Sequence, residues 1–111
     1  MALPHAVSGQ LIDVRPLGDQ LAAATSKAIL KTQTLELMRL VLPKGKSLPD
    51  HHVPGEVTLL CLEGSVELVA HGATQIMRAG EMVYLEGGVP HALQAVEDAS
   101  VLLTILLKPA S

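Results

Sequence analysis

Two places in this chain carry histidines in a setting suited to chemistry. The pair His51-His52 follows the approach Gly-Lys-Ser-Leu-Pro-Asp, and His91 follows Gly-Gly-Val-Pro, so that each place begins a strand after a loop. Imidazole can hold a divalent metal or transfer a proton near neutral pH. His5 lies in the irregular N-terminus and His71 precedes a glycine in a hairpin turn. We expect both of these side chains to be solvated.

The segments that must position these histidines are short apolar or alternating runs separated by glycine and proline. Expected strands cover residues 28–31, 35–42, 56–62, 65–70, 74–77, 82–85, 91–96 and 101–107. Such even spacing is typical of a β-sandwich or a closed barrel. No segment after residue 30 shows a sustained helical period. We therefore predict an all-β domain over residues 28–111. An irregular N-terminal arm over residues 1–27 precedes it, with one helical turn at 19–24.

Composition excludes several classes of function. The 111 residues suffice for one domain, and the formal charge of −3 comes without a basic tract, so nucleic acid is not an expected partner. No stretch approaches the roughly 20 apolar residues of a membrane helix, and the N-terminus lacks the pattern of a signal peptide. We expect no membrane partner and a cytoplasmic location. Cys61, the one cysteine, lies in an apolar run and is predicted to be a buried, inert thiol.

Two stretches resemble the conserved motifs of the cupin superfamily. The first stretch is Gly45-x5-His51 with Pro54-Gly55-Glu56 and Leu62-Glu63-Gly64, and the second is Gly80-x5-Glu86-x-Gly88-Val89-Pro90-His91. The resemblance implies a double-stranded β-helix, the cupin jelly-roll barrel, with a site in its lumen. It also implies a small-molecule ligand and, for an enzyme, metal-dependent oxygenase or isomerase chemistry.

The family's metal site is only half kept in this chain. Cupins use two histidines one residue apart and a glutamate from the first motif, together with a histidine from the second. His51 and His91 match two of these positions, whereas Val53 and Val57 stand at the other two. Two imidazoles alone form a weak metal site, because catalytic centres usually have three protein ligands.

Three interpretations of the histidines stay open at this point. Because side chains alternate along a strand, His51 would face the lumen, and His52 and Glu56 would face outward. A β-bulge near Pro54-Gly55 would turn His52 or Glu56 inward as a further ligand for Zn, Fe, Ni or Mn. In a second interpretation His51 and His91 line a metal-free pocket of a non-catalytic binding or sensing module, or act as an acid–base pair. In a third they are structural residues held by hydrogen bonds.

Further expectations concern the surface and the core. The run 101–107 is apolar on both faces, so its outer face should be covered by the N-terminal segment or by a second subunit. We therefore expect a homodimer. Arg39 and Glu86 are expected to be solvated, because charged side chains are seldom buried. The three methionines Met38, Met77 and Met82 are expected to fill the core.

Overall fold

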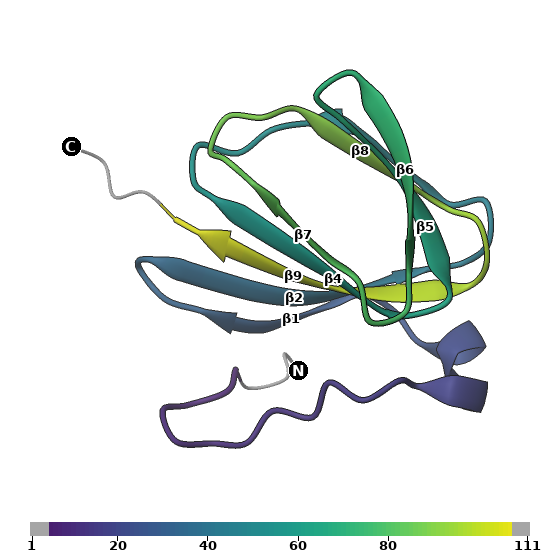
Figure 1. The fold of residues 1–111 in the computed structure, drawn as a ribbon. Coiled ribbons are helices and arrows are strands. Elements are labelled where there is room, and N and C mark those ends of the chain that lie inside the picture. The colour runs from purple at the N-terminus through teal and green to yellow at the C-terminus, as the bar shows by residue number, and fades with distance from the viewer. Residues whose placement is uncertain (1–4, 108–111) are drawn as a thin grey trace.

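The computed structural model describes residues 5–107 as two facing β-sheets preceded by an arm (Figure 1). The elements are a 3-10 helix, η1 (Gly18–Ala23), and nine strands: β1 (Lys27–Lys31), β2 (Leu35–Leu42), β3 (Ser47–His51), β4 (Val57–Glu63), β5 (Ser65–Ala70), β6 (Ala73–Arg78), β7 (Met82–Leu85), β8 (His91–Ala95) and β9 (Ala99–Leu106). One sheet has the order β1-β2-β9-β4-β7 and the other has the order β3-β8-β5-β6. The prediction of an all-β fold is confirmed.

The hydrophobic core lies between the two sheets. Alternation along the strands sends every second side chain inward, so β4 buries Val57, Leu59 and Cys61 while Thr58 and Leu60 face out. The expectation of a buried thiol at Cys61 is confirmed, since the residue is fully buried.

The methionines do not all belong to the core. Met77 is buried and Met38 is half-buried, but Met82 is well exposed. Met82 pairs with Leu60 across the β4–β7 ladder, and this register places it on the outer face of the sheet. The expectation of a core position was therefore wrong for Met82, because β7 is an edge strand and only one of its faces meets the core.

Strand β3 was not expected from the sequence, which placed His51 at the start of a strand, whereas His51 is the last residue of β3. Its residues Ser47–His51 contain Pro49 and only one aliphatic side chain, which is the opposite of a usual strand composition. These residues can form a strand because β3 lies at the edge of its sheet and because its pairing with β8 is irregular between Leu48 and His51. Proline in a sheet is confined to such edges and irregular positions, where no N–H is required.

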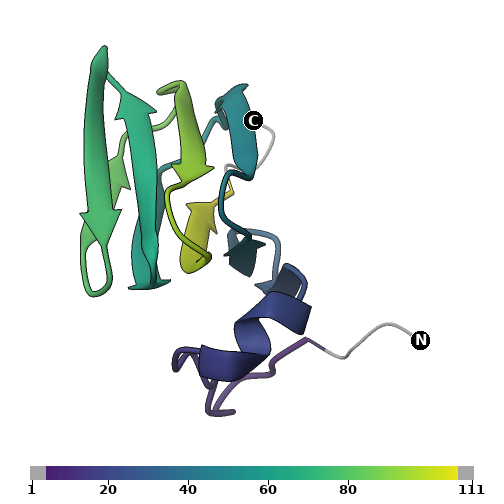
Figure 2. The same ribbon diagram turned by 90° about the vertical axis from the view of Figure 1, so that its right-hand side faces the viewer.

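The N-terminal arm and η1 lie outside the two sheets, as Figure 2 shows. The arm is attached to the five-stranded sheet at several points: Ala6 N–H donates to the carbonyl oxygen of Ile29, and two backbone N–H groups at the start of η1 donate to the Glu63 carboxylate. Arg39 lies beneath the arm and is buried, so the expectation of a solvated Arg39 was wrong. Within residues 5–107, no helix has the length and apolarity needed to cross a membrane.

Candidate functional site

A cavity of about 300 Å³ lies between the two sheets and contains both motif histidines. Its remaining wall is almost entirely aliphatic, with contributions from both sheets: Leu40, Leu48, Pro49, Leu59, Leu93 and Leu103. Leu59 and Leu93 belong to the hydrophobic core and the other leucines of the wall pack against it, so the cavity is continuous with the core. A site of this kind recognises a ligand by apolar contact and orients it by a few polar groups.

The two histidines are direct partners in the β3–β8 ladder. His51 lies opposite His91 in the register, and their ring centroids are 4.5 Å apart with an angle of 53° between the ring planes. His91 is 3% exposed, whereas His51 is at the exposed end of β3. The pairing of β3 with β8 is irregular between Leu48 and His51. This irregularity precedes Pro54-Gly55, the place where the sequence suggested a β-bulge.

Backbone hydrogen bonds fix the orientation of both rings. His51 Nδ1 is 3.0 Å from the carbonyl oxygen of Pro49, and His91 Nδ1 is 3.1 Å from that of Val89. A carbonyl oxygen can only accept, so each neutral ring must carry its proton on Nδ1. The Nε2 atom of each ring is then left with a lone pair. Both rings line the cavity, so these two atoms are acceptors that its wall can offer to a ligand.

Valines stand where the family resemblance would place further ligands. Val57 is 3% exposed and belongs to the hydrophobic core, and Val53 packs against that core. Neither side chain can coordinate a metal. Their inward positions agree with the alternation that also sends His51 toward the lumen.

The two further candidate ligands are not brought to the histidine pair. Glu56 accepts a short hydrogen bond from the Tyr84 hydroxyl and lines a shallow groove on the outer face with Thr58. That bond raises the pKa of Tyr84, with desolvation and the Glu56 charge adding to the effect. His52 is exposed and does not contribute to the lumen cavity.

The donor set therefore falls short of a three-ligand metal centre. Within the described part of the chain, no group of three or more His, Cys, Asp or Glu side chains is arranged to hold a metal ion. Among the described residues that line this cavity, the two imidazoles are the side chains that could bind a metal. A catalytic metal usually requires three protein ligands and one open position.

Sequence reasoning missed the part of the wall that Leu48 and Pro49 provide. Both residues belong to β3, the strand that its composition concealed. The sequence feature that could have predicted this strand was His51 itself. If His51 faces the lumen at the end of a strand, the residues just before it form part of the barrel wall. A strand with Pro49 at a sheet edge would have satisfied that condition.

Comparison with known proteins assigns the fold to a family. A family model described as Cupin domain matches residues 38–106, more than half of the chain. A search of the curated proteins finds no match. Among solved structures, a conserved protein of unknown function from Streptococcus pyogenes is 23% identical with a TM-score of 0.76, and the alignment covers 99% of this chain and 97% of that one.

Two further solved structures share the barrel. An RmlC-like cupin protein from Desulfovibrio desulfuricans is 26% identical with a TM-score of 0.68, covering 92% of this chain and 97% of that one. Salicylate 1,2-dioxygenase from Pseudoaminobacter salicylatoxidans is 20% identical with a TM-score of 0.67, covering 72% of this chain and 24% of the enzyme. These matches confirm the predicted double-stranded β-helix.

Proposed function

Because the chain belongs to the cupin superfamily, we propose that its barrel is a small-molecule-binding module in which His51 and His91 orient a ligand inside an apolar cavity. The observation that carries this proposal is the pair of adjacent imidazoles, each tied through Nδ1 to a backbone carbonyl, in a wall that is otherwise aliphatic. No metal is required for this function.

The chemistry of the wall defines the ligand. Two Nε2 lone pairs need a donor, so the ligand carries a hydroxyl, carboxylic acid or ammonium group at the histidine end. The leucines need an apolar body, which gains roughly 25 cal/mol for each Å² removed from water. A cavity of about 300 Å³ is at the small end of ligand sites and suits a compact body such as a six-membered ring.

A matched pair of probes tests the requirement for a donor. Cyclohexanol has a hydroxyl donor, and methoxycyclohexane has a similar ring but no donor. In NMR titrations we expect the wild-type protein to bind cyclohexanol about fivefold to tenfold more tightly, the value of one hydrogen bond. The double variant His51→Leu with His91→Leu should abolish this preference and His52→Ala, a change at the exposed neighbouring histidine, should keep it. Equal affinity of the wild-type protein for the two probes would contradict the proposal.

A divalent metal ion is the second candidate occupant. Its specific support is the fixed Nδ1–H on both rings, because metal-binding histidines usually donate their other ring nitrogen to a carbonyl or carboxylate. Nε2 of His51 and Nε2 of His91 would hold Zn, Fe, Ni or Mn. A bound ion would supply Lewis-acid or oxygen-activating chemistry for an oxygenase or isomerase.

Elemental analysis after incubation with each of these ions separates the two candidates. The metal hypothesis predicts about one ion per chain, lost in His51→Ala and in His91→Ala. Glu56→Ala and His71→Ala should retain the ion, since Glu56 is bonded on the outer face and His71 lies in an exposed turn. If the wild-type protein takes up none of the four ions, the metal hypothesis is contradicted. The proposal that the cavity binds a small molecule with a hydrogen-bond donor then stands alone.

We also propose that the chain forms a homodimer through the outer face of the five-stranded sheet. The arm lies over the part of this face that contains Arg39 and runs on to Ile29 of β1. Toward the other end Tyr84 and Leu106 are 55% and 45% exposed and line a shallow groove, and Met82 on the edge strand β7 is 61% exposed. Exposed apolar surface of this kind marks contact sites.

Light scattering tests the dimer directly. We expect a dimer at micromolar concentration for the wild-type chain and a monomer for Tyr84→Glu combined with Leu106→Glu. The same pair of charges at Ile76 and Val69, which are exposed on the opposite sheet, should leave the dimer intact. A wild-type monomer would contradict the proposal.

A further inference from the structure

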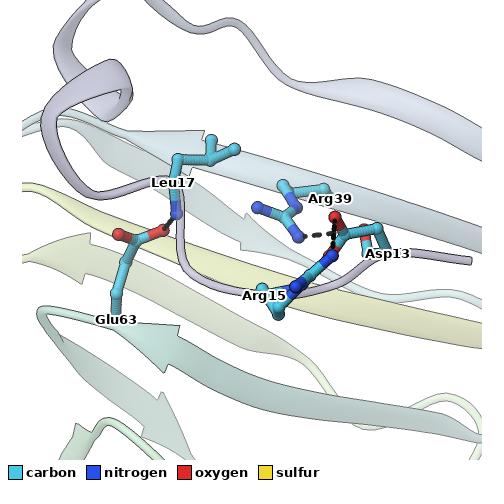
Figure 3. Close-up of polar contacts among 5 residues, drawn as sticks. All are labelled: Asp13, Arg15, Leu17, Arg39 and Glu63. Carbon is cyan, nitrogen blue, oxygen red and sulfur yellow. Dashed lines mark hydrogen bonds and ion pairs between the residues drawn. The ribbon is translucent and has the colours of Figure 1, made fainter.

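Arg39 is a buried cation that no carboxylate of the described residues contacts directly. Its side chain is 3% exposed and lies between β2 and the arm, as Figure 3 shows. Nη2 donates a long hydrogen bond of 3.4 Å to the carbonyl oxygen of Asp13, and Nη1 has no hydrogen-bond partner among residues 5–107. A buried guanidinium that lacks partners is costly, because it has lost water and gained no counter-ion. Arg39 thus offers a strong donor that no group of residues 5–107 uses.

Two carboxylates lie within electrostatic range of Arg39, but other groups already bind both. Asp13 accepts two hydrogen bonds of 3.0 Å from the Arg15 side chain. Glu63 accepts hydrogen bonds from two backbone N–H groups of the arm and from the Ser100 hydroxyl. Neither carboxylate forms an ion pair with Arg39 in the described structure. Within residues 5–107, neither of these carboxylates is therefore free to pair with Arg39.

Two clefts open beside Arg39 under the arm. Their volumes are about 720 and about 310 Å³, and both are lined by Asp13, Lys27 and Arg39. Lys27 is the register partner of Arg39 in the β1–β2 ladder, and Arg15 lines the larger cleft as well. The larger cleft thus contains three cations and one carboxylate. Its volume is within the range of sites for small molecules.

We propose that the larger cleft binds a small organic molecule through an oxyanion group, a carboxylate or a phosphate, that pairs with Arg39 and Lys27. The guanidinium fork matches both anions in a bidentate arrangement, and the lysine adds a point charge. The incoming anion replaces the long Asp13 carbonyl contact at Nη2 and supplies the missing partner of Nη1. The arm stays attached during this exchange, because its bonds to Glu63 lie at a separate point.

This site is separate from the histidine cavity. Leu40, the neighbour of Arg39 in β2, lines the lumen, so alternation places the Arg39 side chain on the opposite face of the sheet. The proposal therefore does not depend on what the barrel lumen binds. A lumen variant serves as its control.

Titration calorimetry at low ionic strength tests the site, with inorganic phosphate and succinate as probes. We expect saturable binding of at least one probe by the wild-type protein. Arg39→Met keeps the apolar stem and removes the charge, so it should weaken binding about tenfold or more. Lys27→Gln should weaken binding several-fold. Lys31→Gln removes an exposed cation from the same strand that lines neither cleft, and should leave the affinity unchanged.

Several outcomes would overturn the proposal. The first is the absence of saturable binding for both probes, and the second is equal weakening in Lys31→Gln, which would indicate unspecific attraction to positive charge. Unchanged affinity in Lys27→Gln also contradicts the site, and this variant decides the question if Arg39→Met does not fold. Loss of binding in His91→Leu would place the anion in the lumen instead.

Discussion

His51 and His91 are register partners across β3 and β8, with ring centroids 4.5 Å apart, yet only His91 is buried. The buried ring forms part of the inner wall, and the exposed ring lies at the end of an edge strand. Each ring is tied to a carbonyl oxygen two residues before it in the chain. The pair thus combines one imidazole packed into the inner wall with one at the exposed end of an edge strand.

This asymmetry predicts different losses of stability for the two histidines. His91→Ala should lower the free energy of unfolding by about 1–3 kcal/mol, because it removes a packed ring and leaves the Val89 carbonyl without its partner. His51→Ala should change it by no more than about 0.5 kcal/mol, the usual range for surface positions. Urea denaturation measures both values. Equal decreases in the free energy of unfolding would show that the difference in burial between the two rings does not affect stability.

Gly55 in the Pro-Gly-Glu turn is predicted to tolerate no side chain. A Cβ atom there would lie 1.5 Å from the carbonyl oxygen of Leu106, and Leu106 N–H donates to the Glu56 carbonyl, so β9 cannot move away without loss of that bond. Gly55→Ala should cost more than about 3 kcal/mol in urea denaturation.

A second glycine provides the control for this prediction. Gly45 has a φ of +84° but open space around its Cβ position, so Gly45→Ala should cost only about 1 kcal/mol from backbone strain. A Gly55→Ala variant as stable as Gly45→Ala would show that β9 yields at this point.

The strands that the sequence predicted are those whose composition agrees with their environment. Segments 35–42, 65–70 and 82–85 match β2, β5 and β7, because aliphatic runs bounded by glycine or proline have few alternatives to a strand. Strand β3 was missed because Pro49 and the polar residues around it are compatible with a strand only at a sheet edge. Edge position is a property of the topology, which local sequence does not record.

The candidate site was partly predictable for a similar reason. Alternation and motif spacing identified His51 and His91, and the structure brings these two residues together. The burial of Arg39 was not predictable, because the arm that covers it is irregular and lies more than twenty residues earlier in the chain. Long-range coverage of one strand by such a segment leaves no periodic signal.

Cys61 is predicted to be unreactive in the folded protein. Burial raises the pKa of its thiol, and a backbone hydrogen bond with Glu63 opposes this only partly, so little thiolate forms at about pH 8. A thiol reagent such as dithiobisnitrobenzoate should label the native chain only through unfolding, and at once in concentrated urea. Rapid labelling of the native chain would contradict the burial of this residue.

Glu63 is predicted to make the attachment of the arm sensitive to acid. Burial acts to raise the pKa of its carboxyl group, but hydrogen bonds from Ser100 and from the backbone of Leu17 and Gly18 outweigh burial and hold the pKa below its ordinary value of 4.5. A depressed folded-state pKa stabilises the fold fully above the unfolded-state value, and the stabilisation is lost as pH falls through the folded-state pKa. The contribution is thus present at neutral pH and disappears below pH 4.5.

The variant Glu63→Gln isolates this contribution. It should lower the free energy of unfolding by about 1 kcal/mol at neutral pH, since an amide oxygen is a weaker acceptor than a carboxylate. The difference from the wild-type protein should shrink as the pH is lowered past the folded-state pKa, because the wild-type group is then neutral as well. Glu86→Gln, a change at an exposed loop carboxylate, should give a small difference at every pH. A Glu63→Gln difference that stays constant into acid would mean that the carboxylate charge plays no part in holding the arm.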